Sequence, residues 1–205
     1  MGVNSDFKRL NREFFKREPV VVARELLGKY IIRKIDSEII IGKIVETEAY
    51  GGTEDKGCHV GRYGRTKKTE LLFGEVGKAY IYPVYINTYC LNVVAHKDNK
   101  AGGVLFRALE PILGIEKIIE NLNKDKNYDI TKLLNGPGKI CKGLKIGRDL
   151  NGYDMIEGDE IYIVEGEKVK EDEIITTPRI NIPYAGKDKY LPWRFIIKDS
   201  KFLSR

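Results

Sequence analysis

Residues 29–50 read K-Y-I-I-R-K-I-D-S-E-I-I-I-G-K-I-V-E-T-E-A-Y, and this stretch indicates the class of fold. It contains two runs, residues 29–35 and 38–50, that are rich in isoleucine and other residues typical of β-strands. The polar pair Asp36-Ser37 separates the runs and predicts a tight turn. We therefore expect a long antiparallel hairpin, which favours a sheet made of neighbouring antiparallel strands.

Short β-rich runs recur through the rest of the chain. Two strands and a tip are expected in residues 78–95, and single strands in residues 103–109, 160–165, 174–181 and 193–198. Helical signals cover residues 19–27, 111–122, 130–134 and 138–144. Strands and helices do not alternate regularly, so the sequence predicts an α+β fold. We expect a mostly antiparallel curved sheet or open barrel with flanking helices and a protruding β-hairpin, in which Pro83 marks an edge strand or a bend.

Length and composition are those of one folded domain. The chain has 205 residues, of which 42% are hydrophobic and 32% charged, so it can bury a sizeable core. There is no repeat and no obvious linker, and we expect a single domain over residues 1–205, with residues 1–18 as an N-terminal arm. Lys and Arg total 36 against 30 for Asp and Glu, a net charge of +6 that favours polyanionic partners such as nucleic acid. A lysine-rich solvated surface explains the same charge equally well.

Cysteine usage and the N-terminal residues bear on location and cofactors. Three scattered cysteines cannot all pair within one chain, and reduced thiols in the cytosol are the simplest explanation. Residues 1–12 contain no apolar segment typical of a signal peptide, and no run approaches the length of a membrane span. Neither a Cys/His cluster nor a phosphate-binding glycine loop is present. We therefore expect an intracellular protein that is not in a membrane and needs no metal or other cofactor.

Glu46, Glu48 and Tyr50 alternate along the second run, so their side chains should lie on one side of the sheet. A carboxylate beside an aromatic ring can activate water next to a planar group, which makes Glu48 the candidate general base. Glu46 is a rival that could share a proton with Glu48 or pair with Arg107 or a lysine. The alternative is that both are ordinary solvated carboxylates on a strand.

Tyrosines are concentrated in residues 78–95. Tyr80 and Tyr82 should share a face, and Tyr85 lies near the predicted hairpin tip. Ordinary β-propensity explains Tyr80 well, because tyrosine suits half-buried strands. It explains Tyr85 less well, because an aromatic residue at a tip gains no packing. An exposed aromatic wedge beside a basic loop is how some proteins separate DNA bases.

Residues 51–77 form a long segment rich in glycine and basic residues. Arg62, Arg65, Lys67 and Lys68 fall within seven residues of it, and they are candidates for contacts with phosphates. The alternative is a solvated loop. Lys139 belongs to a second, weaker candidate, because Gly136-Pro137-Gly138-Lys139 precedes a predicted short helix whose N–H groups could face a phosphate.

Several sequence blocks occur together in a fixed order. They read I-V-E-T-E-A-Y-G-G-T-E-D (44–55), G-R-Y-G-R-T (61–66), Y-I-Y-P-V-Y-I-N-T-Y-C-L-N-V-V (80–94), G-G-V-L-F-R-A-L-E-P-I-L-G (102–114) and L-L-N-G-P-G-K-I-C (133–141), with His59 between the first two. In this order and at these separations they resemble the alkyladenine (3-methyladenine) DNA glycosylase family. The resemblance runs from about Pro19 to the end of the chain.

The resemblance implies a monofunctional DNA-repair glycosylase. Such an enzyme flips an alkylated or deaminated purine out of duplex DNA and hydrolyses its N-glycosidic bond, leaving an abasic site. By position, Glu48 would activate the water and Arg107 would help to hold it. Tyr50 and Tyr82 would sandwich the flipped base, with His59 along its edge. The implied partner is double-stranded DNA with a damaged purine, and we expect the protein to act as a monomer.

Asn92 and Tyr85 acquire roles from the same resemblance. Asn92 would lie in the floor of the base pocket and clash with the 2-amino group of normal guanine, and Tyr85 would intercalate where the nucleotide left. The chain departs from the family near the DNA. Lys67-Lys68-Thr69 stands where many relatives have Pro-Arg-Asn, and Ile86-Asn87 replaces the usual Gly-Met after the intercalating tyrosine.

Two other functions use the same residues. A non-enzymatic nucleic-acid-binding β module could use the basic segment and the tyrosine hairpin. A carbohydrate hydrolase could use Glu46 and Glu48 as its two carboxylates, but their spacing puts both on the same side of a cleft. Glu48 separates the first alternative from a glycosylase, because a pure binder gains nothing from a carboxylate that faces an aromatic pocket.

Overall fold

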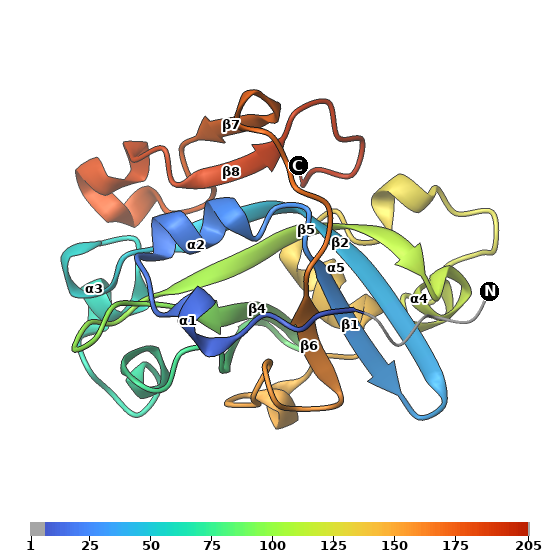
Figure 1. The fold of residues 1–205 in the computed structure, drawn as a ribbon, viewed down its shortest axis with the longest axis horizontal. Coiled ribbons are helices and arrows are strands. Elements are labelled where there is room, and N and C mark those ends of the chain that lie inside the picture. Colours follow the sequence, from blue (N-terminus) through green and yellow to red (C-terminus); the bar gives the residue numbers. More distant parts are fainter. Residues whose placement is uncertain (1–6, 205) are drawn as a thin grey trace.

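A curved sheet of eight antiparallel strands organises the protein, and its six principal strands follow the order β3-β4-β5-β2-β1-β6. The structure, a computed structural model, describes residues 7–204. The sheet curls into an open half-barrel (Figure 1). The strands are β1 (Tyr30–Ile35), β2 (Glu38–Tyr50), β3 (Ala79–Tyr85), β4 (Thr88–Val94), β5 (Gly103–Leu113), β6 (Ile161–Val164), β7 (Ile174–Thr177) and β8 (Arg194–Ile197). The predicted α+β class and curved antiparallel sheet are confirmed.

The hairpin predicted from residues 29–50 is present as β1 and β2. Ile35 pairs with Glu38 across the turn, and Asp36 adopts a φ of 53°, in the left-handed region that aspartate tolerates better than most residues. β2 is long enough to meet two partners along one edge, because its first half pairs with β1 and residues Glu46 to Glu48 pair with β8. β5 runs along its other edge. The segment of β2 that carries both glutamates is therefore held by strands on both sides.

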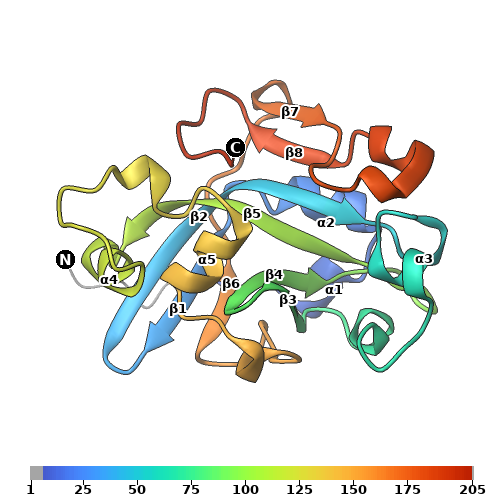
Figure 2. The ribbon, with the colours of Figure 1, turned by 180° about the vertical axis from the view of Figure 1, so that it is seen from behind.

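Short helices cover both faces of the sheet. They are α1 (Arg12–Phe15), α2 (Pro19–Glu25), α3 (His59–Tyr63), α4 (Ile115–Asn121) and α5 (Pro137–Gly143). α2 lies in front of the sheet in Figure 1, and α5 lies in front of it in the reverse view of Figure 2. On the α2 side, the Thr47 hydroxyl donates a hydrogen bond of 2.7 Å to the Ala23 carbonyl. Phe106 is fully buried within the main apolar core.

The helix predicted over residues 111–122 is wrong in its first part. Residues 111–113 continue β5, in which Pro111 pairs with Gly42 and Leu113 with Ile41, and the helix α4 begins only at Ile115. The apolar spacing is misleading because Ile112 and Leu113 are exposed on the strand and do not face a helix interior. Gly114, with a φ of 75°, makes the turn between strand and helix.

The β3–β4 hairpin lies at the edge of the sheet. β3 is the outermost strand at one end of the order, which fits the edge position predicted from Pro83, and the pairing is irregular between Pro83 and Tyr85. Asn87 turns the chain with a φ of 55°. Tyr85 and Ile86 are 77% and 93% exposed, so the tip presents apolar side chains to solvent.

Short 3₁₀ turns lie between these elements. They span Gly52–Glu54, Glu70–Phe73, Ile130–Lys132, Arg148–Leu150, Glu171–Glu173 and Pro183–Tyr190. Two of them, together with α3, lie in the long segment 51–77, which is therefore more ordered than a plain loop. β7 ends at Thr177 rather than at the predicted residue 181, and Pro178 follows, which cannot donate a hydrogen bond to the sheet.

Part of the predicted N-terminal arm, residues 1–6, lies outside the described residues. Within the described part, Leu10 donates a backbone hydrogen bond to Ile163, Arg9 bridges to Val164 and the Phe15 side chain is fully buried. Across residues 7–204, every helix falls short of the length and apolar character that crossing a bilayer requires.

Candidate functional site

A row of four side chains crosses neighbouring strands on the face opposite Thr47. Glu48 on β2 pairs with Leu105 on β5, Leu105 pairs with Asn92 on β4, and Asn92 pairs with Tyr80 on β3. Directly paired residues in antiparallel strands project on the same face. Alternation adds Tyr50, Arg107 and Tyr82 to that face. The strand register thus brings together residues that are far apart in sequence.

Glu48 is fully buried, and donors hold both oxygens of its carboxylate. The Tyr50 hydroxyl donates to Oε2 at 2.8 Å, and the Ile180 backbone N–H donates to Oε1 at 2.7 Å. Arg107 reaches Oε2 through Nη1 at a longer distance of 3.3 Å. Donors from β2, from β5 and from the segment after β7 therefore converge on this one carboxylate.

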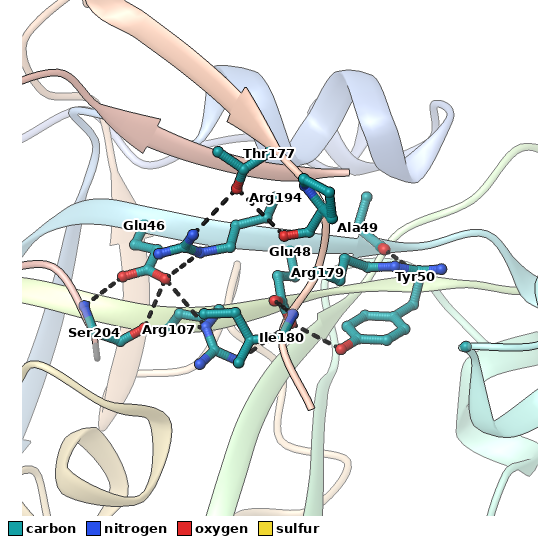
Figure 3. A network of polar contacts seen from close by, with 12 residues as sticks. Glu46, Glu48, Ala49, Tyr50, Arg107, Thr177, Arg179, Ile180, Arg194 and Ser204 are labelled. Atoms are coloured by element: carbon teal, nitrogen blue, oxygen red, sulfur yellow. Dashed lines mark hydrogen bonds and ion pairs between the residues drawn. The ribbon is translucent and has the colours of Figure 1, made fainter. Parts of the chain in front are cut away.

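Glu46 is buried to the same extent but is held differently, as Figure 3 shows. Its Oε1 accepts from Arg107 Nε at 3.1 Å and from Arg194 Nε at 2.7 Å. The Ser204 backbone N–H and hydroxyl donate to Oε2 and Oε1 at 2.6 and 2.7 Å. Two guanidinium groups and one serine therefore occupy this carboxylate, and the expected pairing with Arg107 is present.

Arg107 joins the two carboxylates. Burial disfavours its charge, but Glu48 and then Glu46 more than offset that effect and raise the pKa of the guanidinium above its ordinary value. The residue is therefore a permanent cation within hydrogen-bonding distance of both acids. With Arg194, the network contains two positive and two negative groups, so buried charge is balanced within it.

An aromatic cluster lies beside this network. The His59 ring meets Tyr82 edge-on with centroids 4.5 Å apart, and its Nδ1 lies 2.9 Å from the Tyr80 hydroxyl. Burial, and then the charge of Arg62, lowers the pKa of His59, so the ring is neutral near pH 7. Burial also raises the pKa of Tyr80, which stays protonated. Two neutral groups thus share this hydrogen bond.

Tyr50 and Tyr82 are both within electrostatic reach of Glu48. Burial, followed by the Glu48 charge, raises the pKa of Tyr50 well above its usual value. For Tyr82, burial and the nearby Cys90 come first, and Glu48 adds to the same upward direction of the pKa. Burial raises the pKa of the Cys90 thiol to about 11. The phenols and the thiol therefore remain neutral, and Glu48 is the negative group among them.

No sequence pattern marks Arg179, which is buried against Tyr50. Its guanidinium carbon lies 4.8 Å from the centroid of the Tyr50 ring and 5.1 Å from that of Trp193. Nη1 donates to the Ala49 carbonyl at 2.9 Å, and both terminal nitrogens contact the Asp55 carboxylate, at 2.5 and 2.7 Å. Arg179 thus packs on the ring that donates to Glu48 and restricts where that ring can lie.

Asp55 folds the glycine-rich stretch that separates Tyr50 from His59. Besides Arg179, its carboxylate accepts from the backbone N–H groups of Gly51 and Gly57, at 2.9 and 2.8 Å. A side chain at Gly61 would place its Cβ 2.0 Å from the Asp55 carbonyl oxygen, so only glycine fits there. The chain therefore returns tightly from β2 to α3, and His59 stands at the start of that helix.

The predicted backbone-contacting residues are exposed, but their surroundings differ. The Arg62 guanidinium lies 4.2 Å from the Tyr184 ring centroid, and Arg65 forms an ion pair of 3.1 Å with Glu70. Lys67 and Lys68 make no ion pair with any residue in 7–204. Lys139 is tied to its own loop, because its Nζ donates to the Lys132 carbonyl and to Asn135, at 2.9 and 2.7 Å.

Asn92 and Tyr85 lie at opposite extremes of exposure. Asn92 is buried beside Tyr80, and its side-chain Nδ2 donates to the Tyr80 carbonyl at 3.0 Å. That bond fixes the amide, so the side chain is a rigid part of the face that carries Glu48. Tyr85 projects from the hairpin tip and packs little.

Sequence reasoning missed the residues that the C-terminal part of the chain supplies. Arg179 and Ile180 follow β7, Arg194 opens β8, and Ser204 lies near the end. Arg194 alternates with apolar neighbours and read as an ordinary strand residue. No motif marks Arg179 or Ser204, and a backbone N–H such as that of Ile180 carries no sequence signal. Their roles depend on β8 pairing with β2, which is not visible in the local pattern.

Comparisons with known proteins give a consistent result. The model of the family described as Methylpurine-DNA glycosylase (MPG) matches residues 13–201. A protein of Clostridium perfringens (strain SM101 / Type A) is 41% identical over 203 residues, which cover 96% of this chain and 99% of that protein. Proteins of Clostridium acetobutylicum and Carboxydothermus hydrogenoformans are each 45% identical, and the matches cover 96% of this chain and 97% and 98% of those proteins. All three bear the name "Putative 3-methyladenine DNA glycosylase".

Proposed function

The chain belongs to the methylpurine-DNA glycosylase family of DNA-repair enzymes, and on that basis we propose that it excises alkylated or deaminated purines from duplex DNA. We propose hydrolysis of the N-glycosidic bond by a water that Glu48 activates, with an abasic site as the product. The observation that carries the proposal is the burial of the Glu48 carboxylate in a row with Leu105, Asn92 and Tyr80. The rings of Tyr50, Tyr82 and His59 lie beside that row.

The proposed chemistry needs one carboxylate. The oxygen of water attacks C1′ of the sugar, the bond from C1′ to the purine nitrogen breaks, and its electron pair leaves with the base. The proton of the attacking water passes to Glu48. As the bond breaks, positive charge builds on the sugar, and the negative Glu48 stabilises it. General base catalysis alone contributes about 10²–10⁴-fold.

Arg107 is proposed to hold the attacking water together with Glu48. Its Nη1 is 3.3 Å from Glu48 Oε2, a distance that leaves the pair loose enough for a water to bond to both groups. Because Glu46 also contacts this guanidinium, the positive charge of Arg107 is shared between two acids. Glu48 therefore keeps negative charge for the developing positive charge on the sugar.

Tyr50 and Tyr82 are proposed to stack on the flipped base, with His59 along its edge and Asn92 beneath it. A purine methylated on N3 or N7 is cationic and leaves as a neutral molecule, so it needs little help from an acid. A neutral lesion such as hypoxanthine leaves as an anion and takes up the proton that Glu48 received from the water. The faces of tyrosine rings attract such a cation by about 0.5–2 kcal/mol each. Flipping costs a few kcal/mol and costs less at a damaged pair, which favours lesions over normal bases.

The experiment that tests this proposal uses a panel of duplexes. Each contains one lesion (3-methyladenine, 7-methylguanine, hypoxanthine or ethenoadenine) and is incubated with the protein, with an undamaged duplex as the control. Strand breaks should appear at the lesion only after treatment with alkali, because a monofunctional enzyme leaves an intact abasic strand. Breaks without alkali would contradict the monofunctional part of the proposal. An absence of breaks for every lesion would contradict excision itself.

A pure binding module fits these observations less well. Burying an unneeded carboxylate costs free energy, and here the cost is met by an arginine, a phenol and a backbone N–H that converge on Glu48. A carbohydrate hydrolase would need a second carboxylate across a cleft, but Glu46 lies on the same strand and is occupied by Arg107, Arg194 and Ser204.

A further inference from the structure

We infer that Ser204 is a positioning residue for Arg107, and that with Glu46 it forms a latch at the end of the chain which sets the geometry of the Glu48 site. The inference rests on the proposed function, because it concerns how the water between Arg107 and Glu48 is held. Ser204 lies 158 positions from Glu46 in the sequence, and no motif marks it.

The contacts of Ser204 are specific. Its backbone N–H donates to Glu46 Oε2 at 2.6 Å, and its hydroxyl donates to Glu46 Oε1 at 2.7 Å. The hydroxyl oxygen also accepts from Arg107 Nε at 3.2 Å. A hydroxyl can donate one hydrogen bond and accept another at the same time, so this one group links the Glu46 carboxylate to the Arg107 guanidinium. Ser204 and Glu46 are buried, which shields these bonds from competing water.

The latch determines which edge of Arg107 faces Glu48. Guanidinium and carboxylate groups favour two parallel hydrogen bonds, and a free Arg107 would approach Glu48 in that way. Here Nε is engaged by Glu46 and Ser204, so only Nη1 reaches Glu48, at 3.3 Å. The arginine is therefore kept from closing on Glu48 and occupying the oxygen that the water needs.

Arg194 completes the arrangement from β8. Its Nε lies 2.7 Å from Glu46 Oε1, and its Nη1 donates to the Thr177 hydroxyl at 3.1 Å. A second cation on Glu46 means that Arg107 is not needed to neutralise that acid. Arg107 can then be oriented by Glu46 while its charge acts on Glu48. Figure 3 shows the side chains of Arg107, Arg194 and Ser204 converging on the Glu46 carboxylate.

The test is a double-mutant cycle measured by single-turnover excision. Ser204→Ala removes the hydroxyl bonds to Glu46 and Arg107 and keeps the backbone N–H. We expect about a tenfold slower excision with unchanged affinity for the damaged duplex, less than the roughly 10²-fold that a 1 Å misplacement can cost. In the Arg107→Ala background, Ser204→Ala should cause no further loss, because its effect passes through Arg107. Ser200→Ala, in the same segment, should excise at the wild-type rate.

Several results would overturn the inference. The first is an unchanged excision rate in Ser204→Ala, and the second is a loss of affinity for the damaged duplex in place of a loss of rate. The third is a loss of rate from Ser204→Ala that is as large in the Arg107→Ala background as in the wild-type protein. If Ser204→Ala unfolds at the assay temperature, Ser204→Thr replaces it, because threonine retains the hydroxyl. Ser204→Thr should excise at the wild-type rate, and a slow variant counts against the latch. A wild-type protein without excision activity would instead refute the proposed function.

Discussion

At the scale of single residues, Glu46 and Glu48 are both buried and share Arg107, yet the structure gives them different surroundings. Glu48→Gln keeps size and polarity but removes the carboxylate that we propose as the general base, together with its negative charge. We expect single-turnover excision to fall by at least about 10²-fold, the low end of general base catalysis. Affinity for damaged duplex should hold or rise slightly, because a negative charge near the phosphates is lost.

Glu46→Gln is the matched control. Glutamine keeps an acceptor oxygen for Ser204 and Arg107, so we expect a much smaller loss of rate than in Glu48→Gln. The free energy of unfolding should fall, because Arg194 loses a charged partner in a buried network. An inactive Glu46→Gln beside an active Glu48→Gln would mean that the base is assigned to the wrong glutamate.

His59 provides a pH-dependent prediction. Its pKa in the folded protein lies below 6.5, first because of burial and then because of Arg62. Protonation therefore favours the unfolded state, and the contribution of His59 to stability is present above pH 6.5 and is lost as the pH falls toward the lowered pKa. Arg62→Gln should raise the pKa of His59 and reduce that loss.

The measurement for His59 is a proton NMR titration of its ring, with melting temperatures at pH 5 and pH 8. The chain has two histidines, and His59→Ala identifies the signal. Arg62→Gln should show a smaller difference in melting temperature between the two pH values than the wild type. An unmoved titration curve would show that Arg62 exerts no field on the ring.

At the scale of elements, the β3–β4 hairpin presents Tyr85 on an exposed tip. Tyr85→Ala empties the gap that we propose the ring fills after flipping. Excision from a duplex should fall more than excision from a single strand, where unstacking is cheaper. Tyr190→Ala is the control, because Tyr190 is also an exposed tyrosine, at 68%, but lies outside the hairpin. Equal losses on both substrates would argue against a wedge.

The elements also show where sequence reasoning works. Alternation along β2 placed Glu46, Glu48 and Tyr50 on one face, and the bonds from Arg107 and Tyr50 agree with it. The same reasoning failed at residues 111–113, because an exposed apolar strand end and a helix face give similar local patterns. The local pattern does not show that these residues pair with β2, because that pairing depends on residues about 70 positions away and not on local propensity.

At the scale of the whole molecule, the residues around Glu48 come from segments that are far apart in the sequence. Glu48 comes from an early strand, whereas Arg179, Ile180, Arg194 and Ser204 come from the last part. Figures 1 and 2 show β8 lying along β2, with which it pairs. A sequence can reveal a carboxylate on a strand, but the donors that surround it are set by sheet topology. The resemblance to a family supplied the remaining candidates because it carries that topology implicitly.

The charge of the molecule gives a prediction about DNA. Binding should weaken steeply with salt, because phosphate contacts release counterions. Lys67 and Lys68 are the strongest candidates, because both are exposed on the segment after α3 and pair with no acid within residues 7–204. Replacing both with glutamine should flatten the slope of log K against log[salt] by about one to two units.

Lys124→Gln combined with Lys126→Gln is the matched control for this salt dependence, because it removes the same charge from two exposed lysines just after α4. α3 and α4 lie at opposite sides of the molecule in both Figure 1 and Figure 2. Direct contact at Lys67 and Lys68 predicts a changed slope for that pair and an unchanged slope for the α4 pair. An equal, small change in both would mean that net charge alone attracts the DNA. An unchanged slope for Lys67 and Lys68 would place the DNA on another face, because a lysine that neutralises a phosphate must contribute to counterion release.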